Sequence, residues 1–197
     1  MKTAVLIGLS RHRIGVDGSG VTTLVAFHGC PLNCKYCLNP QALSPEELFK
    51  AVSKDDLYFR ATGGGITFGG GEPLISCKEI LHFRSICLKN GKKWKINIET
   101  SLNVPKTFVE LMKKVIDHWI VDIKDINPNI YKAYTGKDNK QVISNLQYLI
   151  DNNAKITARV PLIAGFNTEL DVKNSILSLE RMGIIDIDRF TYTVKKH

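Results

Sequence analysis

Residues 66–100 read ITFGGGEPLISCKEILHFRSICLKNGKKWKINIET and contain a complete strand–helix–strand unit. A short apolar strand is predicted at 66–68, and it runs directly into glycines. A helix is predicted at 78–88, because its apolar residues recur on one side and Asn90-Gly91 ends it. The sequence KINIET at 95–100 is then the next strand.

The same alternation continues on both sides of this unit. Further strands are predicted at 22–27, 119–123, 155–160 and 189–194, and further helices from Ser44-Pro45 onward, at 106–116, at 140–150 and at 169–182. About six β–α alternations favour parallel strands joined by right-handed crossover helices. Six strands are too few for a closed eight-stranded barrel. We therefore predict an α/β fold, an open partial (β/α)6 barrel of parallel strands, with a flat doubly wound sheet as the alternative.

Length and composition fit one soluble domain spanning residues 1–197. The chain is 44% hydrophobic and 23% charged, as expected for a globular protein. Its formal net charge of +8 favours an acidic partner without naming one, and nucleic acid is not expected. Because no apolar run is long enough to span a membrane and the start does not resemble a signal peptide, we expect a cytoplasmic protein with no membrane partner.

Polar residues gather where the predicted strands end. They are Cys30 after the first strand, Gly70, Gly71 and Glu72 after the second, Glu99 and Thr100 at the end of the third, Asp122 and Lys124 around the end of the fourth, and Arg159 in the fifth. Functional residues of parallel α/β sheets lie at the carboxyl ends of the strands. We therefore expect these residues to form one site.

The loop after the first strand carries Cys30, Cys34 and Cys37 in a CxxxCxxC pattern. Three thiolates this close together can ligate one soft metal centre. An iron–sulfur cubane needs four ligands, so three would leave one iron open to a small molecule. The alternative is a structural zinc site with His28 as the fourth ligand. Cys77 and Cys87 stand apart and are expected to be buried helix residues.

Several separate motifs together resemble the radical S-adenosylmethionine (SAM) enzymes over almost the whole chain. They are the CxxxCxxC pattern with Tyr36 before its last cysteine, Gly70-Gly71-Glu72-Pro73, Asp17-Gly18-Ser19-Gly20, Asp122-Ile123-Lys124, and the stretch from Arg159 to Asn167. The last three resemble motifs of the glycyl-radical-enzyme activating enzymes. Ser19 and Leu38 depart from that pattern, where proline and histidine are usual.

This resemblance implies the cofactors and the role of each matching residue. Cys30, Cys34 and Cys37 would ligate a [4Fe-4S] cluster, and Tyr36, Asn39, Gly70, Gly71, Glu72, Glu99, Thr100, Asp122, Lys124 and Arg159 would surround SAM. Glu72 would position the backbone, Lys124 and Arg159 would pair with the cofactor carboxylate, and Arg159 could instead hold Asp122. Glu99, Thr100 and Asp122 would form an oxygen-rich nest for a monovalent cation. Asp17 and Gly18 would meet the substrate backbone.

The resemblance also implies a reaction. The reduced cluster would cleave SAM to a 5′-deoxyadenosyl radical, which would install a glycyl radical on a partner enzyme, with flavodoxin or ferredoxin as electron donor. The alternative is a radical SAM enzyme that modifies a ribosomal peptide, a nucleotide or a small molecule. A metal-binding module without turnover is the third hypothesis, and it requires the other motif matches to be coincidental.

Overall fold

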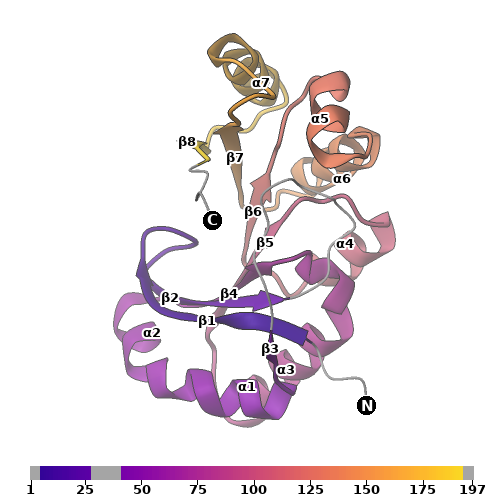
Figure 1. Ribbon diagram of the computed structural model, residues 1–197. Helices are drawn as coiled ribbons and strands as arrows, with labels where there is room; N and C mark the ends of the chain where they lie inside the picture. The colour runs from indigo at the N-terminus through magenta and orange to yellow at the C-terminus, as the bar shows by residue number, and fades with distance from the viewer. Residues whose placement is uncertain (1–4, 28–40, 193–197) are drawn as a thin grey trace.

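The computed structural model describes residues 5–27 and 41–192 and contains one curved sheet (Figure 1). The sheet has eight strands in the order β3-β1-β2-β4-β5-β6-β7-β8. Their bounds are Val5–Ile14 (β1), Val21–Phe27 (β2), Gln41–Ala42 (β3), Gly65–Gly70 (β4), Lys95–Thr100 (β5), His118–Asp122 (β6), Ile156–Leu162 (β7) and Ile187–Thr191 (β8).

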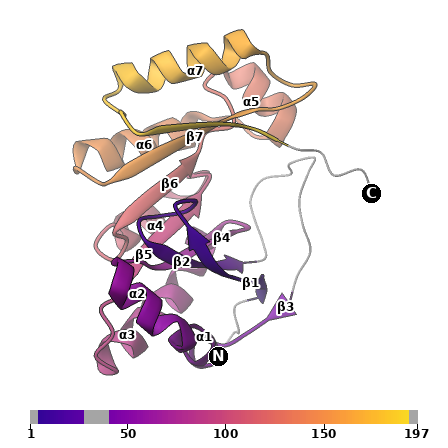
Figure 2. The same cartoon turned by 90° about the vertical axis from the view of Figure 1, so that its left-hand side faces the viewer.

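Six of these strands, β2 and β4 to β8, run parallel to one another, whereas β1 and β3 are antiparallel additions at one edge. The sheet curls without closing, and its helices lie along the outside of the curve (Figure 2). The predicted open partial (β/α)6 barrel is confirmed, because six parallel strands twist in one direction but do not complete a ring.

The helices begin and end at local sequence signals. Their bounds are Pro45–Val52 (α1), Asp56–Thr62 (α2), Cys77–Lys89 (α3), Lys106–Met112 (α4), Pro128–Thr135 (α5), Lys140–Asp151 (α6) and Glu169–Arg181 (α7). Ser44 caps α1 in a reciprocal capping box with Glu47, with Pro45 in the first turn. Thr168 caps α7 in the same way with Asp171.

The two faces of the sheet differ in chemistry. The residues that point toward the helices are apolar and buried, and they form the core: Val25, Phe27, Ile66, Phe68, Ile96, Ile98, Trp119, Val121, Ala158 and Val160. The alternate positions point to the concave side and include Thr67, Asn97, Glu99 and Arg159. Burial of the outer face stabilises the sheet, and the concave face is left to hold polar groups.

Some elements differ from the sequence-based expectation. β1, β3, α2 and α5 were not predicted. The helix predicted at 106–116 is shorter in the structure, where α4 ends at Met112 and the chain turns. Gly63, with φ of 66°, ends α2 in the left-handed conformation. The Gly63–Gly65 segment is therefore the turn between α2 and β4. Within the described residues, no helix has the length and apolar character needed to cross a membrane.

Candidate active site

Charged side chains of four neighbouring strands meet on the concave face near the carboxyl ends. In the parallel register, Asp122 of β6 pairs with Arg159 of β7, which pairs in turn with Asp188 of β8. Glu99 of β5 lies one strand further along, on the same face. Paired positions of parallel strands point to the same side, so the register alone brings these side chains together.

Arg159 forms an ion pair with Glu99, reaching across β6. Its Nε also lies 3.3 Å from Asp188 Oδ2, and its guanidinium lies 4.6 Å from the centre of the Phe190 ring. Among the described residues Asp122 and Arg159 form no direct ion pair, but the charge of Asp122 contributes to the raised pKa of Arg159, and that Arg159 holds Asp122 stays a prediction. Burial raises the pKa of Glu99, and the charge of Arg159 acts in the opposite direction.

Lys124 lies just beyond β6 and is buried, with 8% of its side chain exposed. It forms an ion pair with Asp122 and donates a hydrogen bond to the Tyr192 hydroxyl over 2.6 Å. Burial is the largest single influence and acts to lower the pKa of Lys124, but the charges and hydrogen bonds of Asp122 and Tyr192 together outweigh it, so the pKa is raised. The charged ammonium form of Lys124 is therefore favoured.

Two buried polar atoms of this cluster have no hydrogen-bond partner within the described residues. They are Oδ1 of Asp122, an acceptor, and Nε of Arg159, a donor whose contact with Asp188 at 3.3 Å is an ion pair without hydrogen-bond geometry. An unpaired buried polar group is costly, and its usual explanation is a bound molecule or water. A donor and an acceptor left open beside a buried ammonium suit a zwitterionic ligand such as the amino-acid end of SAM. The residues present therefore fit that cofactor.

The glycines after β4 bring its backbone close to β2. Gly70 has φ of 88°, and a Cβ atom there would lie 2.8 Å from the Cα atom of Ala26. The amide of Gly71 donates to the carbonyl of Phe27 over 2.6 Å. A side chain at Gly70 would separate these strands, so glycine is required at this position for both conformation and space.

Glu72 fixes the loop that these glycines begin. The side chain is 1% exposed and accepts four hydrogen bonds, from the Thr100 hydroxyl at 2.6 Å, the Ser101 hydroxyl at 2.7 Å, the Ser101 amide at 3.0 Å and the Leu74 amide at 3.2 Å. The ends of β4 and β5 are thereby joined. These contacts position the backbone and leave the carboxylate no room to act as an acid or base.

The three groups expected to form a cation nest do not converge. Glu99 and Asp122 point to the concave side, whereas the side chain of Thr100 is buried toward the helices and bonds to Glu72. Successive residues of a strand point to opposite faces, so Glu99 and Thr100 cannot both direct their side chains to one site.

Asp17 and Gly18 lie further down the concave face. The Asp17 carboxylate is 1% exposed and accepts hydrogen bonds from Thr22 at 2.6 Å and Arg13 at 2.7 Å. A Cβ atom at Gly18 would lie 2.2 Å from the amide nitrogen of Asn97. The Asp17 side chain therefore holds its own loop, and its expected contact with a substrate backbone stays a prediction.

Five predicted site residues lie outside the described residues: Cys30, Cys34, Tyr36, Cys37 and Asn39. Cys77 and Cys87 are described, and both are buried in α3. Burial raises the pKa of each thiol to about 12. Metal ligation requires the thiolate, so these two cysteines are unsuited to hold a cluster, as expected from the sequence.

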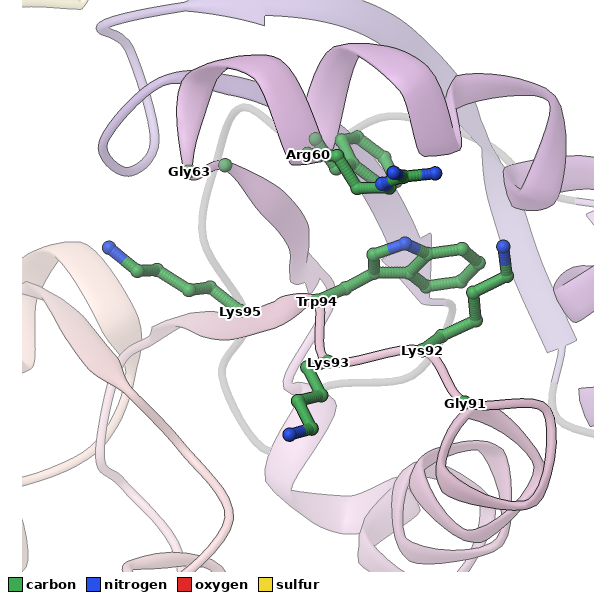
Figure 3. A pocket seen from close by; sticks show the side chains of 9 residues that line it. Arg60, Gly63, Gly91, Lys92, Lys93, Trp94 and Lys95 are labelled. Carbon is green, nitrogen blue, oxygen red and sulfur yellow. The ribbon is translucent and has the colours of Figure 1, made fainter.

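A second group of charges surrounds a cavity of about 410 Å³ at the opposite end of the sheet, where β4 and β5 begin (Figure 3). Its basic residues are Arg60, Lys92, Lys93 and Lys95. Asp56 accepts hydrogen bonds from Lys92 at 2.8 Å and from the Trp94 indole at 2.7 Å. Since α2 and α3 both end here, these cations complement the negative ends of the two helices.

Comparison with known proteins places the chain in a family. Residues 24–173 match the model of the Radical SAM superfamily. The pyruvate formate-lyase-activating enzyme of Clostridium pasteurianum is 31% identical over 83% of this chain and 70% of its own length. The (2S)-3-sulfopropanediol dehydratase activating enzyme of Klebsiella oxytoca is 31% identical over 78% of this chain and 70% of its own length.

A solved structure shows the same fold. Streptococcus suis SuiB bound to S-adenosylmethionine superimposes with a TM-score of 0.63 at 17% identity, over 83% of this chain and 37% of that one. The chain belongs to the Radical SAM superfamily and is an enzyme of radical SAM oxidoreductase type. Membership implies a [4Fe-4S] cluster and SAM, as the sequence predicted.

Sequence reasoning did not identify Ser101, Asp188, Phe190 or Tyr192 as parts of this site. The last three alternate along β8 and its continuation, so they point to the concave side together. A prediction that began this strand at 187 instead of 189 and followed its alternation would have placed them beside Arg159. Ser101 has no comparable signal, because its bonds to Glu72 depend on how two loops meet.

Proposed function

We propose that this enzyme is a glycyl-radical-enzyme activating enzyme. The observation that carries the proposal is the buried cluster of Asp122, Lys124, Arg159 and Glu99, with its open donor and acceptor, at the carboxyl ends of the parallel strands. This is the edge of the sheet at which the sequence places Cys30, three residues after β2 ends at Phe27. The relatives described above are activating enzymes by name, which favours a protein substrate.

Each residue has a part in this proposal. Cys30, Cys34 and Cys37 hold the cluster, and Tyr36 and Asn39 hold the adenosine part of SAM. Lys124 and Arg159 neutralise the cofactor carboxylate, while Asp122 accepts a hydrogen bond through its open oxygen. The close approach of β4 to β2 at Gly70 allows backbone groups to contact the cofactor. When bound, the cluster and SAM supply one-electron reductive cleavage and abstraction of a hydrogen atom.

The partners follow from the charge and from the chemistry. A one-electron donor such as flavodoxin or ferredoxin has to reach the cluster, and a net charge of +8 favours association with an acidic donor. A glycine-bearing loop of the partner enzyme would close the open side of the half-barrel and exclude water. We place this reaction in the cytoplasm, where such donors and partners are found.

The proposal is tested by anaerobic reconstitution of the protein with iron and sulfide, followed by reduction and addition of SAM. A candidate glycyl radical enzyme from the same organism is then added, and electron paramagnetic resonance is recorded. We expect 5′-deoxyadenosine and a glycyl radical doublet, and neither from Cys34→Ala.

Two results would contradict the proposal. SAM cleavage that persists in Cys34→Ala would contradict the assignment of Cys34 as a ligand of the cluster. Cleavage by the wild type that gives no radical on the partner, but modifies a small peptide or a nucleotide, would favour the alternative radical SAM reactions.

A further inference from the structure

Tyr192 lies at the end of the concave face and no part of the proposed function uses it. Its amide donates to the carbonyl of Leu162 over 3.1 Å, so the backbone stays paired with β7 one residue beyond the end of β8. The alternation of the strand therefore directs its side chain to the side that carries Arg159 and Phe190.

The hydroxyl of Tyr192 contacts both members of the Asp122–Lys124 pair. It accepts from Lys124 Nζ over 2.6 Å and donates to Asp122 Oδ2 over 3.3 Å. The ring lies 5.1 Å from Lys124 Nζ and packs edge-on against Phe190 at 5.1 Å between centroids. Lys124 is thus held by a carboxylate and by the hydroxyl of Tyr192.

The count of hydrogen bonds shows what this arrangement leaves open. An ammonium group has three N–H donors, and the contacts of Lys124 within the described residues, to Asp122 and Tyr192, use two. Asp122 uses Oδ2 for both partners and leaves Oδ1 without one among the described residues. One donor and one acceptor thus remain next to each other.

We propose that Tyr192 is a positioning residue for the cofactor site: its hydroxyl holds the Lys124 ammonium against Asp122 and leaves one N–H for the anionic end of SAM. This inference rests on the proposed function, because it takes SAM as the ligand of this cluster. Without the hydroxyl, Lys124 keeps Asp122 as its one strong partner and its ammonium group can rotate. The free N–H is then no longer directed at the anionic end of SAM. The aromatic ring alone supplies packing but no direction.

The chain offers a matched control for this role. Tyr148 on α6 contacts a lysine through its ring, with Lys106 Nζ at 4.6 Å from the ring centre. Replacing either tyrosine by phenylalanine keeps the ring and removes only the hydroxyl. Tyr192→Phe therefore removes a hydrogen bond to the buried Lys124 ammonium. Tyr148→Phe keeps the contact of its ring with Lys106.

The first measurement does not need activity. Trace acetylation with acetic anhydride, read by mass spectrometry over a range of pH, gives the reactivity of Lys124 in the cluster-loaded protein. We expect Lys124 to react several-fold faster in Tyr192→Phe, because a hydrogen bond that favours its charged form is lost. The reactivity of Lys124 in Tyr148→Phe should equal that of the wild type.

The second measurement is the affinity of the oxidised, cluster-loaded protein for SAM. We expect the Kd to rise about tenfold in Tyr192→Phe, the usual effect of losing a hydrogen bond to a charged group. In a Lys124→Met background the same substitution should have no further effect, because the hydroxyl acts through Lys124.

The outcomes separate this inference from the proposed function. If Tyr192→Phe matches Tyr148→Phe in Lys124 labelling, or weakens SAM binding equally with and without Lys124, the positioning role is wrong. The proposed function is judged on the wild type alone, by SAM cleavage and by the glycyl radical on the partner. A wild type that binds and cleaves SAM but forms no radical contradicts the proposed function and leaves the Tyr192 result decisive.

Discussion

The two ends of the sheet carry charge in different ways. At the carboxyl ends, Lys124 and Arg159 are mostly buried, with 8% and 19% of their side chains exposed. At the amino ends, 75% of the Arg60 side chain is exposed and its ion pair with Asp56 is long, at 3.9 Å. The basic cavity contains more cations, but of these two groups, within the described residues, it is the cluster that has buried polar atoms without a hydrogen-bond partner. Buried charges with unmet hydrogen bonds, rather than the number of charges, therefore distinguish the candidate site from the basic cavity.

The largest effect expected from this comparison is on cofactor binding. Lys124→Met removes a buried ammonium beside the open oxygen of Asp122, and we expect SAM affinity to fall about a hundredfold, as for a buried charged contact. Lys93→Met at the basic cavity should leave affinity unchanged. The measurement is SAM titration of the oxidised, cluster-loaded proteins. Equal losses in the two variants would show that the binding depends on overall charge.

A second effect is on stability. Arg159→Met leaves the Glu99 carboxylate without its partner, and we expect the free energy of unfolding to fall by about 2 kcal/mol, below the range for a fully buried pair because both groups are partly exposed. Arg60→Met should cost about 0.5 kcal/mol or less, as exposed pairs do. Urea denaturation monitored by circular dichroism measures both. A larger loss for Arg60→Met would reverse the comparison.

The smallest expected effect is the dependence of the free energy of unfolding on pH, which should have opposite signs at the two ends of the sheet. Burial raises the pKa of Glu99 above its ordinary value of 4.5, so folding takes up a proton above that pH and this residue makes stability fall as pH rises. The hydrogen bond from Lys92 lowers the pKa of Asp56 below 3.8, so this residue contributes stability that is lost as pH falls through its folded pKa.

Urea denaturation across pH distinguishes these two contributions. The difference between wild type and Glu99→Gln should decrease as pH rises above 4.5, and the difference between wild type and Asp56→Asn should decrease as pH falls below 3.8. Slopes of the same sign for both variants would contradict the distinction between the two ends.

The sheet could be predicted because its signal is local. Each parallel strand is a short apolar run followed by a polar residue, and the runs at 95–100 and 119–123 correspond to β5 and β6 within a residue. β1 was missed because VLIGLSRHRI mixes apolar and basic residues without regular alternation. α2 was missed because seven residues give too short a helical period.

The sequence predicts where the site residues lie, but it does not predict which of them pair with each other. The sequence placed Glu99, Asp122, Lys124 and Arg159 at one edge, because the first three lie at or just after the ends of predicted strands and Arg159 lies within the next one. The pairing of Arg159 with Glu99 could not be predicted, because it joins two strands separated by a third. The opposite orientation of Thr100 could have been predicted from the alternation of a strand, whereas its bond to Glu72 depends on how the loops pack.

The most direct test of the proposed activity follows one hydrogen atom. The partner glycyl radical enzyme is prepared with glycine deuterated at Cα and incubated anaerobically with the reduced protein and SAM. The deuterium content of the 5′-deoxyadenosine is then measured by mass spectrometry. We expect one deuterium in this product, together with the radical signal on the partner. Unlabelled 5′-deoxyadenosine and a silent partner would contradict it.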